Sequence, residues 1–424
     1  MPSCLVVGGT GVTGSFIVQG LLQRNHTVTV LHSGRHKPSS EMSPWYFNNT
    51  VRILYSSPDD PKKLLETLTK ADGANFYYDH VFVLYGNLRK INSLFVNHCQ
   101  RFYCATGMVV YDTWGNSKSP DSINGMVLSP VNENTPIMTS DGTNQGTPTS
   151  FNPKLNKIIA GQQDVFRNHP SATIVQYGKI YGPYNLLPHQ WLVVKRILDH
   201  RKGIIVSPYS NFFGLLGGAC YSANAAEYFL LAMDKEESKG EIFMAVEDKH
   251  MNVKQWIQII ANALGKPGFE IYELPTKIAI PARPLDHSGL IQDESPPGGL
   301  FYMSNEKAKR LLGYKDVVDP TIGVQETAIW LSKEKNWPSK LTVSKVLQDP
   351  FDYDNEDELL RLWNEHKDWY GCLNLVWKKQ PGWGHFYYGP GDNPGDKYRG
   401  DLKKKYAGKF NRDKEKRIVT NSKL

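Results

Sequence analysis

A glycine-rich segment near the N-terminus constrains the fold of this chain more than any other feature. Residues Gly8 to Gly14 (GGTGVTG) place glycines at the spacing GxxGxxG, after an apolar run, Cys4 to Val7, and before a segment with helical spacing, Phe16 to Arg24. Glycines between a strand and a helix let the backbone approach a pyrophosphate and direct the helix N-terminus at it. The segment therefore predicts a dinucleotide-binding turn. Its cofactor-binding residues are expected to be Gly8, Gly11, Val12, Thr13 and Gly14.

Further along the chain, β-rich runs alternate with helical or loop segments. Such alternation is typical of a parallel sheet with right-handed crossovers. We therefore predict an α/β fold, a Rossmann-type doubly wound parallel sheet with a smaller mixed α/β substrate lobe and a C-terminal extension. The runs expected to form strands are Cys4 to Val7, Thr27 to Leu31, Val51 to Tyr55, His80 to Tyr85, Arg101 to Ala105 and Thr173 to Gln176.

The end of the second predicted strand indicates which dinucleotide binds. An acidic residue there would bind the ribose hydroxyls of NAD and repel a 2′-phosphate. The segment from His32 to Lys37 contains no Asp or Glu. Arg35 can offer several N–H donors to a phosphate, and Ser33 lies beside it. The sequence therefore predicts NADP(H) as the cofactor, bound in part by Ser33 and Arg35; the alternative is a solvated basic turn.

The length of 424 residues exceeds one core of ordinary size, so several structural units are expected. We predict an NADP-binding Rossmann domain over residues 1–184 and a substrate lobe, interleaved with the Rossmann sheet, over residues 185–335. An aromatic-rich extension over 336–396 and a basic tail over 397–424 follow. Helices are expected at Trp191 to His200, Ala223 to Met233, Val253 to Leu264 and Asp357 to Trp369.

Three later motifs, joined to the glycine turn and Ser33-Gly34-Arg35, resemble a known family. Val110-Tyr111 is similar to its "VYG", Tyr181-Gly182-Pro183 matches its "YGP", and Ser304 to Tyr314 is similar to its C-terminal "sKakreLGw". Over residues 3 to 335 the chain resembles an extended, atypical short-chain dehydrogenase/reductase of the NAD(P)-dependent epimerase/dehydratase family. The resemblance implies a Rossmann fold and hydride chemistry, but fold alone does not identify a substrate.

The resemblance also implies catalytic residues, and one of them is absent. The family uses a Tyr as proton donor or acceptor, a Lys four residues later that lowers its pKa, and a Ser or Thr that positions the carbonyl. No tyrosine here has a Lys four residues on. Alignment of the following apolar helix makes Lys157 the family Lys, which would also hold the cofactor ribose, and puts Pro153 at the Tyr position. Thr106 lies next to the usual Ser position.

Two other residues could replace the missing phenol, and each has an alternative structural role. Tyr177, after the sixth predicted strand, could face the nicotinamide or could be a packed aromatic at the sheet end. His189 could supply acid/base chemistry near neutral pH or could cap a helix. Thr106 could likewise be only a polar residue at a strand end, and Lys157 only a solvated lysine on a helix. The predicted catalytic residues are thus Thr106, Lys157, Tyr177 and His189.

The net charge of +7 is concentrated at the C-terminus. Between Lys397 and Leu424 there are eleven Lys and Arg residues and three Asp and Glu residues. Such an end is typical of a solvated segment, and no nucleic-acid partner is expected. The last residues, Ser422-Lys423-Leu424, match a peroxisomal address. We expect them to bind the peroxisomal import receptor and the protein to lie in peroxisomes, or otherwise in the cytosol.

Cysteine usage and hydropathy exclude other classes of protein. The five cysteines are odd in number and form no CxxC pair, which predicts free thiols and neither a disulfide nor a metal site. No run of eighteen apolar residues exists, so no membrane span is expected. The sequence leaves the formation of a homodimer open.

Three functions remain in competition. The first is an NADP(H)-dependent oxidoreductase that acts on a small carbonyl or alcohol metabolite through an active site without the Tyr-x-x-x-Lys pair. The second is an enzyme similar to nucleotide-sugar epimerases and dehydratases, although these usually retain the Tyr and Lys. The third is a catalytically degenerate NADP-binding sensor, or a protein that binds RNA or another partner. We favour the first, because an open cofactor cleft and a peroxisomal address suit metabolism.

Overall fold

A computed structural model describes residues 1–34, 38, 40–85, 88–111, 122–123, 126–127, 130–149, 153–185, 187–208, 218–275, 279, 303–338, 343, 347, 349 and 351–366. Arg35 lies outside these described residues, and so does the basic tail with Ser422-Lys423-Leu424. The predicted helix Asp357 to Trp369 is described as far as residue 366. Within the described part of the chain, no helix is both long and apolar enough to cross a bilayer.

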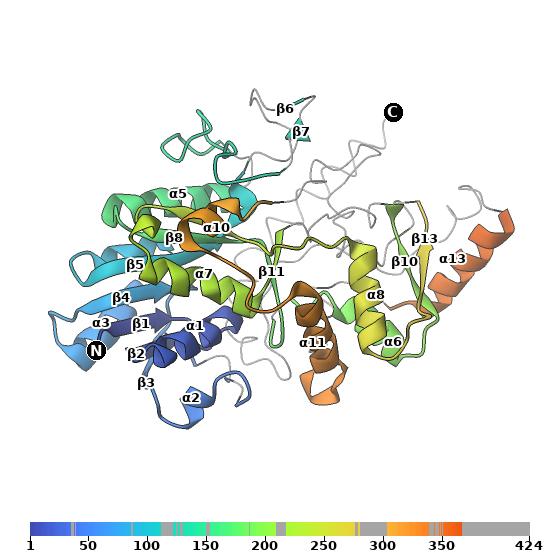
Figure 1. Ribbon diagram of the computed structural model, residues 1–424, viewed down its shortest axis with the longest axis horizontal. Helices are drawn as coiled ribbons and strands as arrows, with labels where there is room; N and C mark the ends of the chain where they lie inside the picture. The colour runs from blue at the N-terminus through green and yellow to red at the C-terminus, as the bar shows by residue number, and fades with distance from the viewer. Residues whose placement is uncertain are drawn as a thin grey trace.

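The centre of the molecule is a seven-stranded sheet in which every neighbouring pair is parallel (Figure 1). The strand order is β12-β8-β5-β4-β1-β2-β3. From β1 the chain moves outward through β2 and β3, then returns to β4 on the other side of β1. This doubly wound arrangement confirms the predicted fold class. The strands are β1 (Ser3–Val7), β2 (Thr27–His32), β3 (Arg52–Tyr55), β4 (Tyr78–Val83), β5 (Cys99–Gly107), β8 (Thr173–Tyr177) and β12 (Ile242–Ala245).

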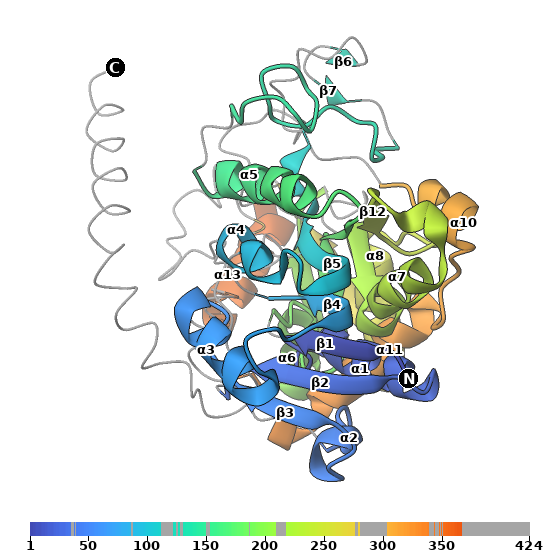
Figure 2. The same cartoon turned by 90° about the vertical axis from the view of Figure 1, so that its left-hand side faces the viewer.

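Helices cover both faces of the sheet, because the strands are apolar on both sides (Figure 2). In β1, Val6 packs into a core with α1 and α7, whereas Leu5 and Val7 pack into a core with α3, α4 and α5. One layer consists of α1 (Val12–Gln23) and α7 (Ser222–Asp234). The other consists of α3 (Pro61–Asp72), α4 (Leu88–Ile91) and α5 (Pro153–Asn168).

A second lobe lies beyond the carboxyl ends of the strands (Figure 1). Its core combines helices with two short parallel strand pairs, β10 with β13 and β9 with β11. These elements are α6 (Trp191–Leu198), α8 (Val253–Ala263), α11 (Pro320–Ser332), β9 (Lys179–Tyr181), β10 (Gly203–Val206), β11 (Ala219–Tyr221) and β13 (Glu270–Glu273). Shorter elements are α2 (Pro44–Phe47), α10 (Glu306–Leu312), β6 (Ser122–Ile123), β7 (Met126–Val127) and the 3₁₀ turns η1 (Asn92–Phe95), η2 (Met108–Val110), η5 (Glu236–Ser238) and η8 (Glu334–Asn336).

Two elements from the sequence range of the second lobe belong to the Rossmann layers. The helix α7 packs against α1, and Gly20 allows their close approach because a Cβ there would lie 2.3 Å from the Leu230 Cδ1 atom. The strand β12 pairs with β8 and extends the sheet. Residues 185–335 therefore contribute to both parts of the molecule.

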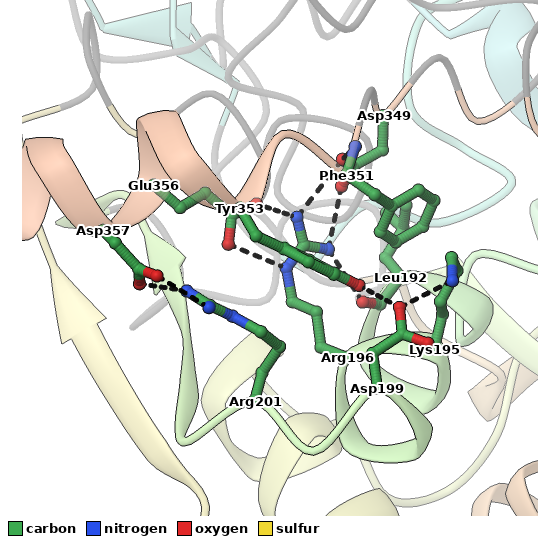
Figure 3. Close-up of polar contacts among 10 residues, drawn as sticks. All are labelled: Leu192, Lys195, Arg196, Asp199, Arg201, Asp349, Phe351, Tyr353, Glu356 and Asp357. Atoms are coloured by element: carbon green, nitrogen blue, oxygen red, sulfur yellow. Dashed lines mark hydrogen bonds and ion pairs between the residues drawn. The ribbon is translucent and has the colours of Figure 1, made fainter.

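The C-terminal extension reaches back to the second lobe through α13 (Tyr353–His366). Figure 3 shows Arg196 of α6 between Asp349 and Glu356, with Arg201 paired to Asp357. The Arg196 guanidinium and both of its carboxylate partners are almost completely buried. This ion-pair cluster joins the extension to α6.

Candidate functional site

The glycine turn joins β1 to α1 in a conformation that only glycines accommodate. Gly8 has φ +91°, its N–H donates to the Leu31 carbonyl over 2.8 Å, and its carbonyl accepts from the Gly11 N–H over 2.9 Å. A Cβ on Gly14 would lie 2.3 Å from the Gly8 oxygen. Glycine at position 14 therefore lets the first turn of α1 pack directly on the loop.

The N-terminus of α1 has no side-chain cap from its own N-cap residue. Gly11 is the N-cap and contributes no side chain to the helix end, while the first helical N–H groups have no partner inside a helix. The turn lies where β1 has β2 on one side and β4 on the other, which is the point where the strand order reverses. Ligands of open α/β sheets bind at the carboxyl ends of such strands. Val12 and Thr13 begin the helix, and Thr13 is nearly buried at 4% exposure.

The end of β2 forms a turn with aromatic surroundings. The His32 Nδ1 atom accepts a hydrogen bond from the Gly34 N–H over 3.2 Å, and Gly34 has φ +72°. The His32 ring lies 4.8 Å from the Tyr55 ring, centroid to centroid, at the end of β3. Ser33 is partly buried in this turn. Because Arg35 is outside the described residues, its predicted contact with a 2′-phosphate stays a prediction.

Thr106 lies near the carboxyl end of β5, at one end of a chain of hydrogen bonds. The Gln162 Nε2 atom on α5 donates to the Thr106 hydroxyl over 2.9 Å. Gln176 on β8 donates to the Gln162 Oε1 atom over 3.5 Å, and the Tyr111 hydroxyl donates to the Gln176 Oε1 atom over 2.7 Å. Since Thr106 accepts from Gln162, its own O–H hydrogen can turn toward a ligand.

Lys157 lies on α5, the helix that carries Gln162, and its side chain is exposed to solvent. The helix begins at Pro153, the position that the family resemblance assigns to the catalytic Tyr. Proline suits the first turn of a helix because it lacks an N–H, but it has no acidic proton. The structure thus places Lys157 and Thr106 on adjoining elements and supplies no phenol at the family position.

Tyr177 lies on the opposite face of the sheet from the Thr106 side chain. Residues paired across parallel strands point the same way, and Thr106 pairs with Gln176 while Tyr177 pairs with Gly107. The Tyr177 ring packs edge-on against Phe229 of α7, with centroids 6.1 Å apart. Burial raises the pKa of its phenol, and the nearby Thr13 side chain acts in the opposite direction. This phenol therefore lies toward α1 and stays protonated at neutral pH.

His189 lies in the segment that leads into α6 and is 6% exposed. Its backbone N–H donates to the Leu187 carbonyl over 2.8 Å, and its carbonyl accepts from the Leu192 N–H over 3.1 Å. The residue thus belongs to the turn that starts a helix of the second lobe, whereas Thr106 and Lys157 belong to the Rossmann layers.

Sequence reasoning missed Gln162 and Gln176. Both are almost fully buried, at 2% and 1% exposure. The sequence does contain a sign of each residue. Gln162 lies three residues from Ile159 and from Val165, on the buried face of α5. Gln176 is a polar residue within the largely apolar strand β8. A buried amide needs partners, so a polar residue at a core position indicates a hydrogen-bond network.

Comparisons with known proteins identify the fold. No family model and no curated protein matches this sequence. Among solved structures, it is similar to the UDP-glucose 4-epimerase of Thermotoga maritima, with UDP-glucose (TM-score 0.54, 15% identity, 78% of this chain and 98% of that chain). It is also similar to the dTDP-glucose 4,6-dehydratase of Bacillus anthracis in complex with NAD (TM-score 0.52, 15% identity, 80% of this chain and 98% of that chain). A third similar structure is the UDP-glucuronic acid 4-epimerase of Bacillus cereus in complex with NAD (TM-score 0.51, 15% identity, 78% of this chain and 96% of that chain).

These matches cover 78–80% of this chain at 15% sequence identity. The chain therefore has the Rossmann-like α/β fold of these epimerases and this dehydratase. This finding confirms, at the level of fold, the resemblance given by the glycine turn and the Tyr181-Gly182-Pro183 motif.

Proposed function

We propose that this protein is an NADP(H)-dependent oxidoreductase that acts on a small carbonyl or alcohol. The observation that carries the proposal is the glycine turn between β1 and α1, at the point where the strand order reverses. The turn fits a dinucleotide for two reasons. Glycine at position 14 lets the first turn of α1 pack on the loop, where a Cβ would clash. The N-cap Gly11 has no side chain to cap the helix, so the first N–H groups of α1 can donate to a phosphate. The NAD complexes of proteins with this fold support a nicotinamide dinucleotide as the ligand.

Bound NADPH would supply a hydride to a carbonyl carbon. Gly8, Gly11 and Gly14 would hold its pyrophosphate against the α1 N-terminus, with the N–H groups of Val12 and Thr13 as donors. Ser33 and Arg35 would contact the 2′-phosphate, and Lys157 would reach the ribose from α5.

Thr106 is the residue that we assign to the substrate carbonyl. In the chain Tyr111–Gln176–Gln162–Thr106 every donor points toward Thr106. Hydrogen bonds aligned in one direction polarise one another, so the chain strengthens Thr106 as a donor to the carbonyl oxygen. Such a donor stabilises the negative charge that develops during hydride transfer. The proton that completes the product alcohol would then pass through the Thr106 hydroxyl from solvent.

The cofactor assignment predicts a selective effect of Arg35. We expect Arg35→Ala to weaken NADPH binding by roughly 1.5–3 kcal/mol, because a charge-assisted hydrogen bond to the 2′-phosphate is lost. NADH binding should change little. Fluorescence titration with both cofactors measures this, with Arg24→Ala at the far end of α1 as the control. An equal loss for both cofactors would contradict the assignment.

The role of Thr106 predicts a loss of rate without a loss of cofactor. We expect Thr106→Val to lower kcat for NADPH-dependent reduction of a carbonyl substrate by about 10²–10³-fold, because one preorganised donor to the oxyanion is removed. NADPH affinity should remain unchanged. Thr67→Val, at a partly exposed threonine of α3, is the matched control. An unchanged kcat in Thr106→Val would remove Thr106 from the mechanism.

A second candidate function is an epimerase or dehydratase acting on a nucleotide sugar. The observation in its favour is the activity named for the similar solved structures. Such an enzyme returns the hydride to the substrate, so it converts a UDP- or dTDP-sugar without net oxidation of the cofactor. Product analysis by mass spectrometry and NMR, beside absorbance at the NADPH band, separates the two functions.

A further inference from the structure

Lys179 is a buried lysine near the carboxyl edge of the sheet. It opens β9, which begins two residues after β8 ends, and it pairs with Ala219 of β11. The residue is 7% exposed, and its Nζ atom has no hydrogen-bond partner among the described residues. The Nζ atom lies 5.2 Å from the centroid of the Trp256 ring on α8.

The described groups around Lys179 do not provide a counter-ion. Tyr181, on the same face of β9, donates to Glu247 over 2.9 Å, and Glu247 also accepts from the Tyr221 N–H over 2.8 Å. Across the described part of the chain, no carboxylate lies within ion-pair distance of the Lys179 Nζ atom. Burial lowers the pKa of Lys179 to about 7. A buried ammonium that has a ring face but no hydrogen-bond or ion-pair partner is unfavourable, so an anion would stabilise the charged form.

Other buried polar atoms of this lobe also lack partners within the described residues. Both amide atoms of Gln190 are unsatisfied although the residue is 0% exposed, and the Trp191 Nε1 atom is unsatisfied as well. The segment that carries them is joined to β9, because the Asn185 Nδ2 atom donates to the Ile180 carbonyl over 2.9 Å. Proteins rarely leave such groups unpaired, so several of them in one lobe indicate that this lobe binds a polar ligand.

We propose that Lys179, assisted by Gln190, binds an oxyanion of the substrate, a carboxylate or a phosphate. The ammonium would donate to the anion, and the Gln190 amide would satisfy a further oxygen. This inference rests on the proposed function and deepens it. The substrate class is a small carbonyl compound that bears a carboxylate or phosphate, bound in the second lobe while its carbonyl faces the Rossmann edge.

The test uses the full chain and two probes, inorganic phosphate and acetate, at constant ionic strength. Binding is measured by isothermal titration calorimetry between pH 6 and 9, with and without NADPH. Lys179→Met removes the amine and keeps the length of the side chain, and Gln190→Leu removes the amide. Lys266→Met changes an exposed lysine of the same lobe and serves as the control.

We expect one of the two anions to bind wild type and Lys266→Met at pH 6. Its affinity should fall about tenfold per pH unit above pH 7, because one proton is needed on the amine. Lys179→Met should bind at least tenfold more weakly without this pH dependence, and Gln190→Leu should show a smaller loss. NADPH affinity should be unchanged in both variants, which also shows that they are folded.

Two outcomes would overturn the site. If neither anion binds wild type at any pH, or if Lys179→Met binds as wild type does, Lys179 is only a buried structural residue. Failure of the proposed function is a separate result. If wild type does not bind NADPH but binds the anion in a Lys179-dependent manner, the anion site stands and the oxidoreductase assignment falls.

Discussion

Gly14→Ala is expected to weaken NADPH binding by at least about 100-fold, or about 2.7 kcal/mol, while the protein stays folded. The added Cβ would lie 2.3 Å from the Gly8 carbonyl oxygen and 2.8 Å from the Gly9 Cα atom. Both are backbone atoms, so the clash is relieved only if the loop and the first turn of α1 move apart. That movement separates the helix N-terminus from the glycines that would hold the pyrophosphate.

The control is a second glycine of the same helix. A Cβ on Gly20 would also lie 2.3 Å from a neighbour, but that neighbour is the Leu230 side chain, at the opposite end of α1 from the turn. Gly20→Ala should lower the free energy of unfolding by about 1–3 kcal/mol through overpacking and leave NADPH binding intact. Denaturant titration and fluorescence titration of both variants separate the two effects. If Gly14→Ala binds NADPH within threefold of wild type, the turn is not the cofactor site.

The sheet was predictable from sequence wherever its strands carry a local signal. The glycine turn and the alternating runs predicted six of its strands. The strand β12 was missed because its four residues, Ile242–Ala245, are all buried. Such a short apolar run lacks the alternation that distinguishes a half-buried strand from a segment of helix. Helix α1 begins at Val12, ahead of the predicted Phe16, since its first residues are small rather than periodically apolar.

The candidate site was predictable only in part, because its contacts join distant residues. The positions of Gly8, Gly14 and Thr106 follow from local motifs and the family resemblance. The hydrogen bonds that lead through Gln162 to Thr106 could not be predicted in this way. Gln162 and Thr106 are 56 residues apart in the sequence, and no short-range pattern indicates that they are in contact. Tyr177 shows the same limit. The sequence places it just after a predicted strand, and the structure makes it the last residue of β8. The direction of its ring, toward Phe229, depends on the register of β8 with β5, which the sequence does not show.

The buried cation Arg196 provides the second large expected effect. The Arg196 Nη1 atom lies 2.9 Å from Asp349 Oδ2 and donates to the Leu192 carbonyl over 2.9 Å, while its Nη2 atom pairs with Glu356 (Figure 3). Arg196 and Asp349 are 0% exposed at the side chain, and Glu356 is 2% exposed. Nothing in the sequence pairs these residues, which are 153 and 160 positions apart.

We expect Arg196→Met to lower the free energy of unfolding by about 3–5 kcal/mol, because it leaves two carboxylates buried without their cation. Burial already raises the pKa of Glu356, and Arg196 opposes that rise. Without Arg196 this pKa rises further. The destabilisation of the variant relative to wild type is therefore largest at neutral pH, where the buried Glu356 carboxylate has no cation beside it. The difference from wild type should shrink as the pH falls toward 5 and the carboxyl group gains its proton.

Denaturant titration from pH 5 to 8 measures this effect, and hydrogen exchange of residues 351–366 shows whether α13 is released. Arg361→Met is the control, because Arg361 forms exposed ion pairs with Glu358 and Glu365 on α13, and exposed pairs contribute little to stability. The triple variant Arg196→Met, Asp349→Leu, Glu356→Leu should regain most of the stability, since apolar side chains replace the whole buried cluster. A loss in Arg196→Met no larger than in Arg361→Met would show that the extension does not depend on this cluster. A loss that stays constant between pH 5 and 8 would show that the Glu356 carboxylate is not its source.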